Sequence, residues 1–248
     1  MNTPARELLA AFETHSVDRI RALLDAGCDA TMPIDGKSPV NHLIEMYFRS
    51  DDFPDCLRLL LERGAVLDDP RIAPVLLNDP SAIDSAVRAD GSLLRHKVSL
   101  VCTFTSLVGA TLLHVAAEYG NVAAAAKLLQ LGAEVDARAE VDAFGLNGHT
   151  PLFHTVNSNA NRSAPLMRLL LAAGAKADVR LHGITWGKDF AWETTCFDVT
   201  PISYAQLGLL PQMQRTEQDC YANVAQLLRA CGRPVQPLEN VPNRYLAQ

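Results

Sequence analysis

A short motif recurs along the chain: two leucines, two or three further residues, and then a glycine. Each copy ends an apolar stretch with helical character, and glycine readily adopts the left-handed backbone conformation that stops a helix. Repetition of one chemistry along a chain is the signature of stacked repeat units, each of which packs against its neighbours. The copies lie at 22–30, 59–67, 127–135, 169–177 and 226–234.

A second element comes before four of these copies and opens with threonine or serine, usually followed by proline. A hydroxyl side chain can accept a hydrogen bond from the first free amides of a helix, and proline at the first helical position loses no hydrogen bond. The sequence therefore predicts helix-turn-helix units, each with a short capped helix and then a longer one. The second element occupies 38–46, 111–120, 150–158 and 200–208.

The segment 109–137, which reads GATLLHVAAEYGNVAAAAKLLQLGAEVDA, resembles the ankyrin repeat family. It departs from the family pattern at Leu112, where proline is usual, and the other units have lost the motif histidine. The resemblance implies that His114 bridges threonine and backbone groups of neighbouring units. The residues that would carry the repeat motif are Thr111, His114, Gly120, Gly132, Thr150, Pro151, Gly174, Thr200 and Pro201.

The resemblance implies an all-α, ankyrin-repeat solenoid of about six helix-turn-helix units over residues 1–233, followed by a C-terminal tail at 234–248. No clear copy of the motif lies near 68–108, although the starts on either side are about two repeat lengths apart. We therefore expect a degenerate unit there. Its helices are predicted near 71–77 and 80–89.

Three connections between units are longer than the family pattern requires, and we call them fingers. The finger at 96–109 alternates in the manner of a strand, and the finger at 180–199 has a turn between two β-prone runs, as in a hairpin. The finger at 134–148 is less regular and turns at Phe144-Gly145. Because the fingers are consecutive, we expect them to lie side by side and to pair into a small inserted sheet.

Aromatic residues are concentrated in the fingers, and both tryptophans of the chain lie in the last one. Large aromatic side chains dominate binding hot spots, although packing between fingers could equally bury them. The resemblance implies a protein-recognition scaffold that binds a partner protein through its concave groove and fingers. The predicted partner-binding residues are Phe104, Phe144, Trp186, Lys188, Asp189, Phe190, Trp192 and Glu193.

The sequence carries no motif of a common enzyme class, because it lacks a P-loop, a GxSxG and an HExxH. Its six cysteines have no metal-ligand spacing and indicate reduced thiols. We therefore predict no enzyme activity, cofactor or metal. His114 and Glu118 could share one helix face, but the repeat places a polar surface residue at Glu118. His149 and His154, five residues apart, are expected on different helix faces.

Charge and hydropathy bear on the partner class. The chain has a formal charge of −6, and residues 1–100 hold 11 Lys and Arg against 16 Asp and Glu. This balance opposes nucleic-acid binding, which depends on clustered basic side chains. No apolar run approaches the length of a membrane span, and we expect no secretion signal, because the first residues lack a basic patch followed by an apolar segment. We predict a cytoplasmic monomer.

Two alternatives remain open from the sequence. The first is a small-molecule binding or catalytic protein with a pocket between the fingers and the groove, favoured if an enclosed cavity brings histidines together. The second is a self-associating structural module whose finger strands pair between chains, which a monomer in solution would exclude. The candidate pocket residues are His114, His149, His154, His182 and Tyr204.

Overall fold

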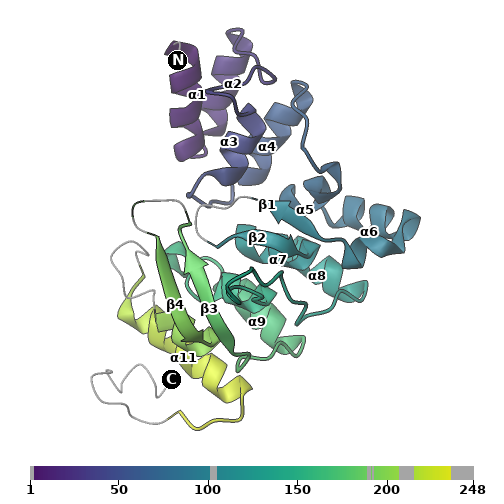
Figure 1. Ribbon diagram of the computed structural model, residues 1–248. Helices are drawn as coiled ribbons and strands as arrows, with labels where there is room; N and C mark the ends of the chain where they lie inside the picture. Colours follow the sequence, from purple (N-terminus) through teal and green to yellow (C-terminus); the bar gives the residue numbers. More distant parts are fainter. Residues whose placement is uncertain (1–2, 101–104, 189–190, 192, 207–214, 236–248) are drawn as a thin grey trace.

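The computed structural model describes residues 3–100, 105–188, 191, 193–206 and 215–235. Helices dominate this part of the chain, and successive helices pack against each other in pairs (Figure 1). The first two pairs are α1 (Thr3–Glu13) with α2 (Val17–Asp25) and α3 (Pro39–Glu45) with α4 (Phe53–Glu62). The later pairs are α7 (Leu112–Tyr119) with α8 (Val122–Gln130), η3 (Pro151–Thr155) with α9 (Ala164–Ala172), and α10 (Pro201–Ala205) with α11 (Glu217–Ala230).

The segment without a clear motif also forms a helix pair. A short turn η1 (Pro70–Ile72) leads into α5 (Ala73–Leu76), and α6 (Pro80–Ala89) follows before the turn η2 (Gly91–Arg95). Asp79 caps α6 by accepting hydrogen bonds from the amides of Ser81 and Ala82 at 2.9 and 3.0 Å. The helices expected near 71–77 and 80–89 are therefore present, and an aspartate caps the second of them.

The motif residues act as helix boundaries in most units. Gly132 and Gly174 have φ angles of 94° and 91°, the left-handed conformation that ends the second helix. The hydroxyl of Thr200 accepts a hydrogen bond from the Ser203 amide at 3.3 Å, as expected for a cap. Thr150 differs from the prediction, because its buried hydroxyl makes no hydrogen bond and Pro151–Thr155 is a 3-10 helix.

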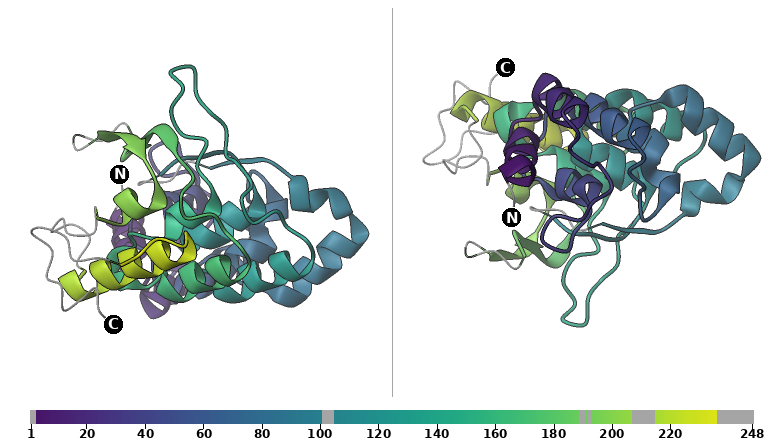
Figure 2. Two further views of the ribbon diagram at one scale, coloured as in Figure 1. Left: turned by 90° about the horizontal axis from the view of Figure 1, so that it is seen from below. Right: turned by 90° about the horizontal axis from the view of Figure 1, so that it is seen from above.

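The fingers form two separate antiparallel pairs of strands instead of one sheet. β1 (Val98–Leu100) pairs with β2 (Leu107–Ala110), and β3 (Leu181–Trp186) pairs with β4 (Thr194–Val199). The 134–148 finger lies between them, since the Glu140 amide donates to Val108 O at 3.0 Å and the Asn147 amide donates to Gly183 O at 2.8 Å. The three fingers thus lie side by side, and they project from one side of the helices (Figure 2).

One apolar core runs through the helix pairs from Leu8 in α1 to Leu228 in α11. In four copies of the motif, the first leucine is fully buried: Leu60, Leu128, Leu170 and Leu227. Four of the second helices therefore each place a fully buried leucine in the core. Each pair can bury its apolar face only against its neighbours, which is the packing expected of a repeat array.

Candidate partner-binding surface

Exposed apolar side chains gather on the fingers. Val108, Val141, Phe144 and Phe197 are 45%, 52%, 81% and 64% exposed. Single exposed apolar residues are ordinary on a protein surface, but a group of them marks a candidate interaction site. A tight turn presents Phe144, because the Asp142 carboxylate accepts hydrogen bonds from the amides of Phe144 and Leu146, both at 2.9 Å.

A cavity of about 330 Å³ opens between the fingers, and we call it the outer cavity. All three fingers contribute to it, and the Thr185 and Thr195 hydroxyls on its wall lie 3.1 Å apart in a hydrogen bond. Three of the predicted partner-binding residues, Phe144, Lys188 and Glu193, line this cavity together. The other lining residues are Ser106, Val108, Glu140, Asp142, Leu146 and Asn147.

Trp186 lies apart from this group. Successive side chains of a strand point to opposite faces, so Trp186 and Ile184 point away from the Thr185 face. Ile184 is fully buried, and Trp186 is half-buried against a second cavity on the helical side of the fingers. The remaining predicted anchors, Phe104, Asp189, Phe190 and Trp192, lie outside the described residues.

The second cavity, of about 390 Å³, lies between the fingers and the ends of the first helices, and we call it the inner cavity. Trp186 and Thr105 line it from the finger side. Tyr47 and Phe48, in the loop after α3, line it from the other side together with Arg162. The polar residues at its wall include Arg49, Glu118 and His154.

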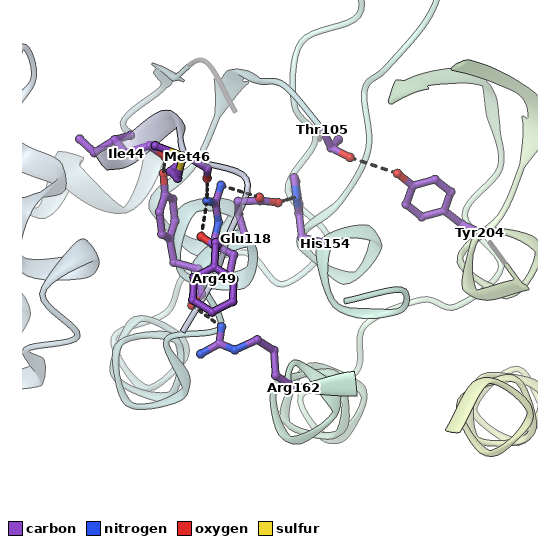
Figure 3. A network of polar contacts seen from close by, with 10 residues as sticks. Ile44, Met46, Arg49, Thr105, Glu118, His154, Arg162 and Tyr204 are labelled. Atoms are coloured by element: carbon purple, nitrogen blue, oxygen red, sulfur yellow. Dashed lines mark hydrogen bonds and ion pairs between the residues drawn. The ribbon is translucent and has the colours of Figure 1, made fainter. Parts of the chain in front are cut away.

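These last three residues form a buried ionic network (Figure 3). Glu118 accepts a hydrogen bond from Arg49 Nη2 at 3.0 Å through one carboxylate oxygen, and from His154 Nδ1 at 2.8 Å through the other. The Arg49 guanidinium also lies over the Tyr119 ring, 4.5 Å from its centroid, a cation–π contact. The side chains of Arg49 and Glu118 are only 8% exposed, and that of His154 is fully buried.

The position of Glu118 corrects the expectation of a polar surface residue. Burial alone would raise the pKa of its carboxyl group, but the hydrogen bond from His154 and the charge of Arg49 outweigh burial and lower that pKa. Glu118 is therefore a buried carboxylate. Its partner Arg49 lies 69 residues away in the sequence, so no local pattern could have indicated the pair.

Three of the candidate pocket histidines come together. The rings of His149 and His154 are 4.8 Å apart between centroids, and His114 lies 5.8 and 6.0 Å from them. The expectation that His149 and His154 occupy different helix faces is wrong, because His149 precedes η3 and helical spacing does not apply to it. His182 lies elsewhere, exposed beside Phe197.

The contacts of His114 show how this cluster is held. Its Nδ1 accepts a hydrogen bond from the Thr111 amide at 3.1 Å, so its Nε2 carries the proton and donates to His149 O at 3.1 Å. Burial lowers the pKa of His114 to about 3 and that of His149 well below its ordinary value. The two rings are therefore neutral at physiological pH, and the His114 ring joins one helix pair to the backbone before the next.

Tyr204, the last candidate pocket residue, is buried away from the histidines. Its hydroxyl is hydrogen-bonded to Thr105 Oγ1 at 3.1 Å, which ties the first helix of the last pair to a finger (Figure 3). Burial raises the pKa of Tyr204 to about 12, so the phenol stays protonated. Within the described segments, no three His, Cys, Asp or Glu side chains are placed to hold a metal ion.

Residues 108–140 match the family model of the ankyrin repeat. The chain contains an ankyrin repeat. The matched segment runs from β2 through α7 and α8 to the base of the next finger, and it includes the His114 contacts. No curated protein matches the chain by sequence. None of the helices in the described segments has the length and apolar character needed to cross a membrane.

Proposed function

We propose that this chain is a non-catalytic scaffold that recognises a partner protein, and that the outer face of its fingers makes the contact. The exposed Val108 and Phe144 at the outer cavity, with Phe197 exposed on β4 two residues from Thr195 of its wall, carry the proposal. Grouped, exposed aromatic and aliphatic side chains suit a protein interface. Ankyrin repeats in general mediate protein–protein interaction, in agreement with this role.

The rest of the molecule would serve as a rigid support for this surface. The consecutive helix pairs share one core, and we propose that they are about six ankyrin-type units, of which the pair α7 and α8 is the most regular. The fingers are hydrogen-bonded to each other through Glu140 and Asn147. A preformed surface of this kind binds without paying much conformational entropy on association.

Capture of partners from a lysate of the native cell tests this role. Phe144→Ser removes the most exposed apolar side chain of the fingers, and we expect it to reduce recovery of the partner severalfold. Val66→Ser is the matched control, since Val66 is 75% exposed but lies on the connection after α4. Both variants should unfold within about 0.5 kcal/mol of the wild type. Unchanged capture by Phe144→Ser would count against the finger surface.

The inner cavity supports a second candidate function, the binding of a small molecule. Its volume of about 390 Å³ lies within the range of ligand sites, and Trp186 faces a buried ionic network across it. A thermal-shift screen of small polar and aromatic compounds tests this function. A stabilising compound should lose its effect in Trp186→Ala, and a screen in which no compound stabilises the protein would argue against it.

A further inference from the structure

Within the part of the chain that the structure describes, strand β4 has one bonded edge and one open edge. β3 runs along the bonded edge, with Gly183 opposite Phe197 and Thr185 opposite Thr195. Among the described residues, no backbone group outside β3 is hydrogen-bonded to the main chain of Thr195 or Phe197. An unbonded strand edge is a template to which another extended segment can pair.

The hydrogen bonds of β3 determine which groups of β4 point to the open edge. Gly183 O accepts from the Asn147 amide, so the main-chain groups of Gly183 face the 134–148 finger and not β4. In an antiparallel pair, the N–H and C=O of one residue point to the same side, and directly opposite residues behave alike. The N–H and C=O of Phe197 therefore point to the open edge, and those of Thr195 do the same.

The sequence of β4 leaves this edge unprotected. Natural proteins block strand edges with lysine, proline or bulges, whereas residues 194–197 read TTCF and are mostly favourable in strands. Regular strand geometry is interrupted only at Asp198, whose φ of 57° is left-handed and whose carboxylate pairs with Arg180. The main-chain groups of Thr195 and Phe197 are thus available for pairing.

The charge near the open edge favours one kind of occupant. Thr195 lines the outer cavity, in which carboxylates outnumber ammonium groups, and the chain as a whole carries −6. A second copy of the chain would bring the same negative charge to this edge, whereas a basic segment would be attracted to it. The charged residues around the cavity are Glu140, Asp142, Glu193 and Lys188.

We propose that the open edge of β4 docks an extended, basic segment of a partner protein, which adds to the sheet as a further strand. The proposal rests on the proposed function, since it specifies the shape and charge of the partner. The added backbone exchanges hydrogen bonds with Thr195 and Phe197, and apolar side chains of the partner cover the exposed Phe197 ring. Lysine or arginine side chains of the partner face the outer cavity.

Amide hydrogen exchange in the free protein tests the geometry. The amides of Thr195 and Phe197 should exchange rapidly, because they point to solvent. The Cys196 amide should exchange slowly, because Cys196 lies opposite Ile184 in a hydrogen-bonded pair. Slow exchange at Thr195 and Phe197 would show that the edge is already covered and would overturn the proposal.

A display library of random short peptides supplies the probe for binding. We expect the selected peptides to be rich in lysine, arginine and strand-forming residues. Thr195→Pro removes the outward N–H, a change that edge strands tolerate. It should weaken the binding of these peptides about tenfold. Thr195→Val is the matched control, because it keeps the N–H and the shape of the side chain, and it should bind within about twofold of the wild type. The melting temperatures of both variants verify that they fold.

Several outcomes would overturn the edge proposal. These are a selection that yields no peptides, peptides that are acidic, and peptides that bind Thr195→Pro as well as the wild type. A dimer that Thr195→Pro dissociates would assign the edge to a second copy instead. None of these outcomes affects the capture experiment with Phe144→Ser. If that variant recovers less partner than the wild type, the proposed function stands even though the edge proposal fails.

Discussion

The carboxylate of Glu118 holds two partners that come from different helix pairs, Arg49 and His154. A buried charge is expensive to leave unpaired, so such a network ties the position of each member to the others. Arg49 approaches from the loop before α4, while His154 lies in η3. This network of three side chains therefore links the second helix pair of the chain to the helix pairs in the middle of the array.

Removing the charge of Glu118 should destabilise the fold. Glu118→Gln removes the counter-charge that Glu118 gives to the buried Arg49 guanidinium, and we expect a loss of about 3 kcal/mol in the free energy of unfolding by urea. Asp55→Asn is the control, because the Asp55–Arg58 pair is about half exposed and should contribute less than about 0.5 kcal/mol. Adding Arg49→Met to Glu118→Gln should recover part of the loss. Equal stabilities of Glu118→Gln and wild type would contradict this account.

The buried histidines predict a loss of stability in mild acid. The folded-state pKa values of His15 and His114 are about 4 and about 3, and that of His149 is also strongly lowered, all chiefly through burial. In the unfolded chain these three rings bind protons below about pH 6.5, whereas in the folded chain they stay neutral to a much lower pH. The stability that is present above pH 6.5 therefore falls as the pH drops. Each ring should cost about 2 kcal/mol by pH 5.

Urea unfolding at a series of pH values between 7.5 and 5 measures this dependence. His182→Gln serves as a control for the substitution itself, because His182 is exposed and lies outside the buried cluster. A free energy of unfolding that is constant over this range would show that the histidines are not held neutral by the fold.

At the scale of the helix, two aspartates occupy the N-cap position, just before the first helical residue, but only one of them caps its helix. Asp79 precedes the proline of α6 and accepts two amide hydrogen bonds, whereas Asp52 precedes α4 and makes no capping bond. Asp79→Ala should therefore lower the free energy of unfolding by about 1 kcal/mol, and Asp52→Ala by no more than a few tenths. Urea denaturation of the two variants measures the difference, and equal losses would contradict it.

Local patterns were sufficient to locate these elements. The leucine and glycine motif marks the ends of second helices, and an Asp-Pro pair marks the start of α6 within the most divergent unit. Patterns of this kind depend on neighbours within a few residues. The 3-10 form of Pro151–Thr155 does not follow from them, since its Thr-Pro start is the same as that of the α-helical Pro201–Ala205.

Contacts between helix pairs lie beyond a sequence pattern. The burial of Glu118 and the meeting of His149 with His154 depend on how neighbouring pairs stack, and their sequence positions give no period that could be detected. The same holds for Trp186, whose side of the finger became known only with the register of β3 and β4. The open edge of β4 likewise follows from the bond between Asn147 and Gly183.

At the scale of the whole molecule, one core joins the first helix pair to the last. We therefore expect a single unfolding transition, because each pair depends on its neighbours for most of its apolar burial. Far-ultraviolet circular dichroism and tryptophan fluorescence should give the same urea midpoint. Two separate midpoints would show that the helices and the finger region, which holds both tryptophans, unfold independently.

The 134–148 finger is bonded on one side to the β1–β2 finger and on the other to the β3–β4 finger. A stacked helical array bends like a spring when each pair rotates slightly on the next. Here such rotation would stretch the bonds from Glu140 to Val108 and from Asn147 to Gly183. The hydrogen-bonded fingers thus stiffen this part of the array. Single-molecule pulling should find it more resistant to extension than the helix pairs before it.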